Sequence, residues 1–147
     1  MDRQKLILFL NQLLANYFVI YVKLHRYQWF SKGEHVFQLQ PFFQELHSKW
    51  KEDIDLLAEH ILTMDGKPYA TMIKYVKEAT IDEATADDEE EEMILQLSHD
   101  LSKLYKEIEE IGLKRAKDIN DELTAHLLFS FQQKLSKIIW RCKAYYK

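Results

Sequence analysis

Apolar residues recur every three or four positions over most of the chain, and this is the period of an α-helix. The first such run covers about residues 3–31 and places Leu6, Leu13 and Leu24 on one face. At ~1.5 Å per residue it would span about 40 Å, the length of a bundle helix. Runs at about 35–64, 88–115 and 119–145 keep the same period. The pattern predicts four long helices.

Two features interrupt this pattern. Residues 65–87 form a long connection in which Met72, Ile73, Tyr75 and Val76 have the spacing of a short helix. A connection of this length is expected where consecutive helices run parallel, because antiparallel neighbours need only a short loop. A helix tolerates proline only near its start, so Pro41 predicts that the regular part of the second helix begins nearer Leu39.

Composition supports one helical domain over residues 1–147. Only 3 Gly and 2 Pro disfavour a sandwich or barrel, and a net charge of −4 does not favour nucleic acid. The single cysteine, Cys142, excludes an internal disulfide and predicts a packed thiol in a reducing compartment. The amino-terminal region lacks a signal-peptide pattern, and Asn11 and Asn16 argue against a membrane span. We therefore expect a cytoplasmic protein.

The second helix carries two polar pairs at helical spacing, Gln40/Gln44 and Asp55/Glu59. All four lie on one stripe beside the apolar face. If the same helix of a second copy packed antiparallel across a two-fold axis, Gln40 would meet the partner's Glu59, and Gln44 would meet the partner's Asp55. On spacing alone, ordinary polar residues beside a helix interface are the simpler interpretation.

Several motifs of this chain resemble those of the Dps family of mini-ferritins. They are Tyr27-x-Trp29, Lys32-Gly33-x-His35-x-Phe37, Leu39-x-x-x-Phe43, Asp55-x-x-Ala58-Glu59, Gly66-Lys67-Pro68, Glu92-Met93, Asp100, Ile139-Trp140 and Ala144-Tyr145. The resemblance covers nearly the whole chain in order. It implies an all-α, ferritin-like four-helix bundle whose long crossover carries a short helix, assembled into a hollow dodecamer. It also implies a di-iron ferroxidase site between two-fold-related subunits.

The chain departs from the family at this site. In the family, one subunit supplies two His and an Asp, and its partner supplies an Asp and a Glu. Asp55 and Glu59 match the latter pair, but the other positions hold Gln28, Gln40 and Gln44. Iron favours imidazole and carboxylate ligands, whereas a glutamine offers one neutral carbonyl. We expect a degenerate centre in which ferroxidase activity is lost or strongly impaired. The sequence therefore does not decide whether the protein is an enzyme.

Three interpretations of the site follow. The amides of Gln40 and Gln44 could donate to the facing carboxylates and close the site without metal. Asp55 and Glu59 could instead hold a single cation, such as iron, weakly. Unrecognised ligands could also sustain oxidation. His25, His35 and His47 lie near these positions in the sequence, and we expect each to be a satisfied or exposed histidine.

The resemblance also bears on pores and DNA. Asp118 and Asp121 are candidates for the acidic residues of a three-fold pore, and His126 stands where the family usually has an Asp. An imidazole there would attract cations less, although a surface histidine without a pore role is equally compatible. Many members of the family bind DNA through a Lys-rich tail before the first helix, and we expect no such tail here. Arg3 and Lys5 alone would neutralise too few phosphates, so DNA binding is not expected.

Together these observations predict a Dps-like, cytoplasmic, homo-oligomeric shell that binds and stores iron and protects against oxidative stress. Its ferroxidase centre would be degenerate. One alternative is an active mini-ferritin that oxidises ferrous iron with peroxide or dioxygen. A second alternative is a DNA-compacting structural protein.

Overall fold

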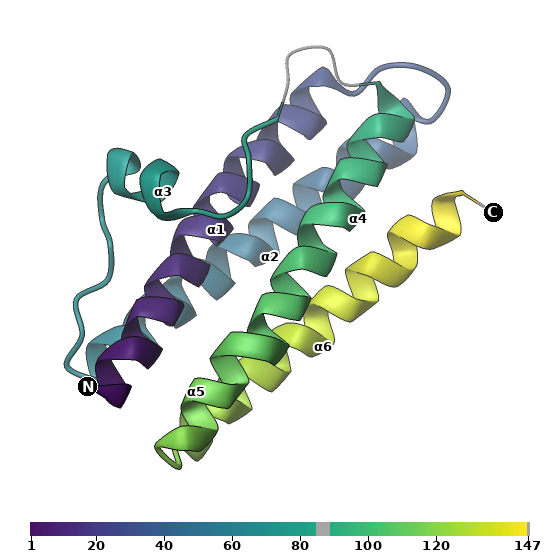
Figure 1. Cartoon of the computed structure of the whole chain (residues 1–147). Helices are drawn as coiled ribbons and strands as arrows, with labels where there is room; N and C mark the ends of the chain where they lie inside the picture. Colours follow the sequence, from purple (N-terminus) through teal and green to yellow (C-terminus); the bar gives the residue numbers. More distant parts are fainter. Residues whose placement is uncertain (85–88, 147) are drawn as a thin grey trace. The chain divides into compact units, whose positions relative to one another are not determined.

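The computed structural model describes residues 1–84 and 89–146, and within these ranges every regular element is helical (Figure 1). The helices are α1 (Asp2–Phe30), α2 (Val36–Thr63), α3 (Met72–Glu78), α4 (Glu90–Glu107), α5 (Leu113–Asp118) and α6 (Glu122–Tyr145), and a π-helical turn, η1 (Ile108–Gly112), joins α4 to α5. The chain divides into two compact units, Asn11–Met93 and Met1–Leu10 with Ile94–Lys147. The four predicted long helices and the short helix are confirmed.

In the Asn11–Met93 unit, α1 and α2 are held together by an aromatic contact. The rings of Tyr17 and Trp50 stack with their centroids 4.1 Å apart. The indole N–H of Trp50 also donates a hydrogen bond of 2.8 Å to the backbone carbonyl of Tyr17. Both side chains are buried, so the contact combines apolar burial with a satisfied polar group. It sets the register of the two helices.

Buried polar residues of α1 hold the crossover segment. Asn11 donates to the carbonyl of Lys67 and accepts from the N–H of Tyr69. Asn16 accepts from the backbone N–H groups of Thr80 and Ile81. These bonds explain why polar residues occupy buried positions of an apolar helix, because an irregular segment needs partners for its backbone groups.

Two more contacts complete the attachment of the crossover. The ammonium of buried Lys23 donates to the carbonyl of Asp82 at 2.8 Å. On α3, Tyr75 is buried and stacks on Phe18 of α1 with a centroid distance of 4.0 Å. The described part of the crossover is therefore tied to α1 at several points along its length.

The start of α2 differs from the expectation. The helix begins at Val36 rather than nearer Leu39, and Pro41 lies inside it. Pro41 removes the hydrogen bond that the carbonyl of Phe37 would accept. Phe37 is an exposed residue, so solvent can replace that bond and the helix continues through the proline.

The turn between α1 and α2 is attached to α4 through His35. The backbone N–H of His35 donates to Glu90 Oε2 at 3.2 Å, and its ring Nδ1 pairs with Glu90 Oε1. Gly33 has a φ of 109°, a conformation that favours glycine. The contacts between His35 and Glu90 and the glycine together define the path of the chain into α2.

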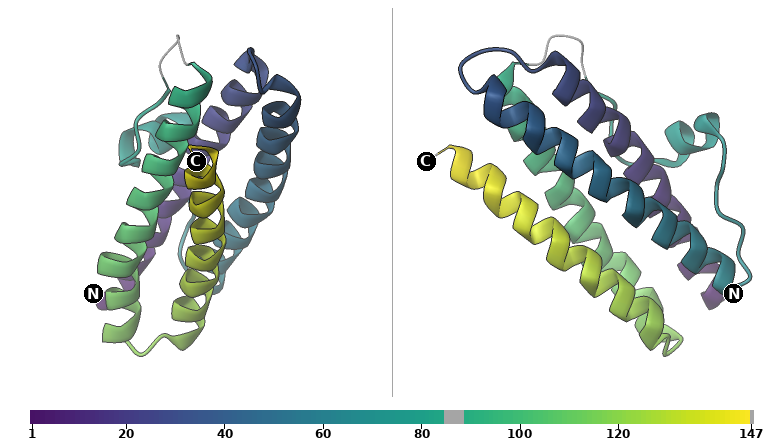
Figure 2. Two further views of the ribbon diagram at one scale, coloured as in Figure 1. Left: turned by 90° about the vertical axis from the view of Figure 1, so that its right-hand side faces the viewer. Right: turned by 180° about the vertical axis from the view of Figure 1, so that it is seen from behind.

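In the second unit, α4, η1 and α5 form one continuous helical segment that lies beside α6 (Figure 2). The predicted third helix therefore extends beyond residue 115 to Asp118, and the fourth begins at Glu122 rather than at 119. Gly112 of η1 lies against Phe9, and a Cβ atom there would come within 2.4 Å of the ring. The core of this unit includes Leu101, Leu104, Ile108, Leu128, Phe131 and Leu135.

Two further sequence expectations concern Cys142 and the α1 helix. Cys142 is buried, so the predicted packed thiol is confirmed, and burial raises the pKa of this thiol to about 11. The α1 helix is long and apolar enough to cross a membrane by length and composition alone, a property that buried core helices share. Most of that window is buried within the protein, and Asn11 and Asn16 bond to the crossover from it.

Replacing Asn16 should release the crossover locally. Asn16→Ala leaves the N–H groups of Thr80 and Ile81 without their acceptor, at a cost of about 2 kcal/mol for this segment. Hydrogen exchange of these two amides should accelerate by roughly 30-fold. Asn16→Asp is the matched control, because it keeps the acceptor oxygens. Unchanged exchange in Asn16→Ala would show that other contacts hold the segment.

Candidate site on the first two helices

The five residues that the sequence singled out all belong to the Asn11–Met93 unit. Gln28 lies in the last turn of α1 and is half-buried, while Gln40, Gln44, Asp55 and Glu59 are exposed on α2. Asp55 lies eleven positions after Gln44 on the same helix, so the two residues are about 16 Å apart along the helix axis. One chain therefore cannot bring its own glutamines and carboxylates into a single site.

Gln28 is hydrogen-bonded to a histidine of the facing helix. The Nε2 atom of His47 lies 2.6 Å from the side-chain oxygen of Gln28. That oxygen can only accept, so Nε2 of His47 carries the hydrogen and donates. The contact joins α1 to α2 at the position where the family resemblance places an iron-binding histidine.

A second histidine lies against the first. The rings of His25 and His47 stack with a centroid distance of 3.9 Å and an angle of 20° between their planes. Nδ1 of His25 lies 2.8 Å from the backbone carbonyl of Tyr21, so this nitrogen is the protonated one. Tyr21 also meets both imidazoles edge to face. The two histidines thus form a small aromatic cluster beside Gln28, and each has a polar partner.

The cluster favours a neutral His47. Burial lowers the pKa of His47 below its ordinary value of 6.5, and the charge of a protonated His25 lowers it further. Two stacked imidazolium ions would repel each other strongly at this distance. His47 is therefore a donor through Nε2 while carrying no net charge at neutral pH.

The donor set of a single chain does not fit an iron site. Within residues 1–84 and 89–146, no group of three or more His, Cys, Asp or Glu side chains is arranged to hold a metal ion. His25 and His47 approach each other face to face, whereas imidazole lone pairs lie in the ring plane, so the stacked pair is not arranged to chelate one ion. Gln28 turns its carbonyl toward His47. The sequence alone did not predict this pairing.

The pore candidates lie around the start of α6. Asp121 is its N-cap: one carboxylate oxygen accepts from the backbone N–H of Thr124 and the other from the Thr124 hydroxyl, at 3.0 and 2.6 Å. Asp118, at the end of α5, and His126, on α6, are both exposed. The carboxylate of Asp121 therefore has a structural role in capping the helix. A pore role for these three residues stays a prediction.

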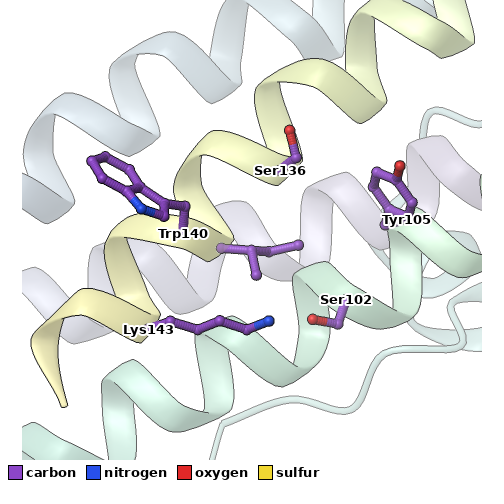
Figure 3. A pocket seen from close by; sticks show the side chains of 6 residues that line it. Ser102, Tyr105, Ser136, Trp140 and Lys143 are labelled. Atoms are coloured by element: carbon purple, nitrogen blue, oxygen red, sulfur yellow. The ribbon is translucent and has the colours of Figure 1, made fainter. Parts of the chain in front are cut away.

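A surface pocket between α4 and α6 was not anticipated from the sequence. It has a volume of about 370 Å³ and is lined by Ser102, Tyr105, Ser136, Ile139, Trp140 and Lys143 (Figure 3). The indole of Trp140 is 70% exposed, and the lining includes no carboxylate or imidazole. The pocket offers hydroxyls, one ammonium and apolar surface, and this is not the chemistry of an iron site.

Comparison with known proteins gives consistent matches over the full length. The family model for a ferritin-like domain matches residues 7–147. General stress protein 20U of Bacillus subtilis (strain 168) is 36% identical over 142 residues, and the alignment covers 97% of each protein. The likeness to a stress protein extends over almost the entire chain of both.

Solved structures agree with this match. The crystal structure of a Dps protein from Bacillus brevis has a TM-score of 0.96 at 34% identity and covers 99% of this chain and 97% of that one. A Dps protein from Vibrio cholerae O1, described as a member of a broad superfamily of ferritin-like diiron-carboxylate proteins, has a TM-score of 0.94 at 33% identity and covers 99% and 91%. The predicted all-α, ferritin-like fold is confirmed.

The lowered pKa of His47 makes stability depend on pH. The unfolded chain binds more protons than the folded protein in the range just below pH 6.5, so the free energy of unfolding should increase as pH rises through that range. In His47→Gln, which does not titrate, the increase should be smaller. Denaturant unfolding of both proteins at several pH values measures this difference. Identical pH dependence would contradict the assigned shift.

Proposed function

Because the chain belongs to the Dps family of ferritin-like proteins, we propose that it forms a hollow homo-dodecameric shell that binds and stores iron. Such a shell would sequester ferrous ions as cargo and so protect the cell from oxidative stress. The relatives named as a general stress protein and as a diiron-carboxylate protein support this proposal. We further propose that its inter-subunit ferroxidase centre is closed by amides and does not oxidise iron rapidly.

The two-fold pairing of α2 is supported by an apolar contact as well as by polar ones. The antiparallel register that puts Gln40 opposite the partner's Glu59 also puts Phe37 opposite the partner's Leu62. Phe37 is 87% exposed and Leu62 is 58% exposed, and both lie on the angular face that carries Gln40. Exposed apolar side chains near both ends of α2 would be buried by this one interface.

The closed site follows from the chemistry of the facing groups. In this register each cluster would contain two glutamine amides from one subunit and Asp55 and Glu59 from its partner. Amide N–H groups donate to carboxylates, and hydrogen bonds to a charged acceptor are the stronger kind. Two irons would instead need the imidazoles and the negative charge that the three glutamines lack. The single observation that carries this proposal is the identity of residues 28, 40 and 44.

Cellular context follows from composition. The buried thiol of Cys142 suits a reducing compartment, and we place the shell in the cytoplasm. A net charge of −4 gives no general attraction to DNA, so we propose that iron handling rather than DNA compaction is the function. Iron would enter through pores and deposit on interior carboxylates, with Asp118, Asp121 and His126 as candidate pore residues.

A charge swap tests the two-fold register. Phe37→Glu and Leu62→Lys should each weaken the assembly, because each places two charges in apolar contacts across one axis. The double variant should regain at least part of the loss, since the carboxylate introduced at position 37 would face the ammonium introduced at position 62 of the neighbouring subunit. Analytical ultracentrifugation measures the oligomer. If the double variant is as weak as the worse single variant, the register is wrong.

Restoring the family ligands should restore metal binding. The variant Gln28→His, Gln40→His, Gln44→Asp should bind zinc tightly and oxidise ferrous iron much faster than the wild-type shell, whose rate should match that of buffer. Isothermal titration with zinc and the absorbance of ferric products measure the two effects. The same triple variant with Asp55→Ala is the control and should lose both gains, because it lacks one partner carboxylate.

Two results would contradict this proposal. Rapid oxidation by the wild-type shell that Asp55→Ala abolishes would mean that the centre is active and that other ligands serve it. An assembled triple variant that fails to bind zinc would mean that the wrong positions have been paired across the interface.

A further inference from the structure

The side chain of Gln28 has two different ends, and the structure distinguishes them. Its carbonyl oxygen faces Nε2 of His47 at 2.6 Å. The two arms of a planar amide diverge by roughly 120°, so the NH₂ group points away from His47. A metal ligand at this position would have to present a lone pair, and the amide nitrogen has none to offer.

The orientation of Gln28 depends on which nitrogen of His47 carries hydrogen. If Nε2 were unprotonated, the amide would turn and donate to it, and the carbonyl would become the outward group. The stack with His25 and the edge contact with Tyr21 confine the imidazole, so Nε2 stays directed at Gln28. His25 is itself held by the bond from Nδ1 to the carbonyl of Tyr21.

We infer that His47 is a positioning residue that holds the Gln28 amide with its NH₂ group outward, as a donor to the carboxylates of the partner subunit. This inference rests on the proposed closed site and extends it to the helix-one position. It assigns a role to a histidine for which the sequence suggested none. It also explains how Gln28 can act with Gln40 and Gln44, which lie on the other helix.

The lowered pKa of His47 is compatible with this role. The neutral Nε2–H tautomer and the imidazolium both donate to Gln28 through Nε2. The amide therefore keeps its orientation whether or not the ring is protonated. A neutral ring also avoids placing a second charge beside His25. Positioning by His47 should therefore persist over the physiological pH range.

The direct test is the tautomer of His47 in the assembled protein. Nitrogen-15 NMR of histidine-labelled protein separates Nε2–H from Nδ1–H rings, and His47→Gln identifies the signal. The expected result is the Nε2–H form at neutral pH. An Nδ1–H ring would reverse the direction of the hydrogen bond and overturn the inference.

A set of variants tests the consequence for assembly. His47→Phe keeps an aromatic ring of similar size but donates nothing, whereas the amide of His47→Gln can donate from near the Nε2 position. We expect His47→Phe to weaken dimer association about fivefold per site, the effect of one lost hydrogen bond, and His47→Gln to recover most of it. Equal losses in the two variants would show that His47 contributes packing alone.

A double-mutant cycle with Gln28→Ala tests whether His47 acts through Gln28. If His47 acts through Gln28, the loss caused by His47→Phe should largely disappear in the Gln28→Ala background. An undiminished loss there would overturn the inference. Failure of the proposed function looks different: metal bound at the wild-type interface would refute the closed site, while the tautomer of His47 and its coupling to Gln28 would still be measured independently.

Discussion

The contact between Tyr17 and Trp50 sets how α1 lies against α2, and the candidate site depends on that register. The two rings stack at 4.1 Å, and the indole N–H is satisfied by the backbone of Tyr17 itself. A slip of α2 by one residue would turn every side chain by ~100° about the helix axis. With the register held, Gln28 near the end of α1 lies opposite His47, and the exposed stripe of α2 points away from the core.

Charge decides what that stripe can do. Carboxylates at 55 and 59 need positive charge or hydrogen-bond donors if an interface buries them, because an unpaired buried charge is costly. In a ferroxidase centre the iron ions supply the positive charge. In the closed site that we propose, the amides of Gln28, Gln40 and Gln44 would supply donors, so the same carboxylates could be buried without metal. Under this proposal, three substitutions would remove the oxidation chemistry from a shell that keeps the family's architecture.

Sequence periodicity was sufficient to predict the long helices, because few other structures bury a residue every 3.6 positions over several turns. It could not reveal the π-turn at Ile108–Gly112, since five residues are too few to distinguish the period of a π-helix from that of an α-helix. The rule for proline misplaced the start of α2 because the affected carbonyl belongs to an exposed residue. The polar positions of the site were found from spacing and resemblance. The His47–Gln28 bond was not, because it depends on how α1 and α2 pack and not on the pattern within either helix.

The central claim is that the interface site holds no metal because glutamine amides occupy it. A crystal structure of the assembled protein soaked in ferrous or zinc ions, examined for anomalous scattering beside Asp55 and Glu59, tests this claim most directly. We expect no metal there and hydrogen bonds from Gln40 and Gln44 to the facing carboxylates. Two metal ions bound between these carboxylates and ligands of the neighbouring subunit would contradict the claim.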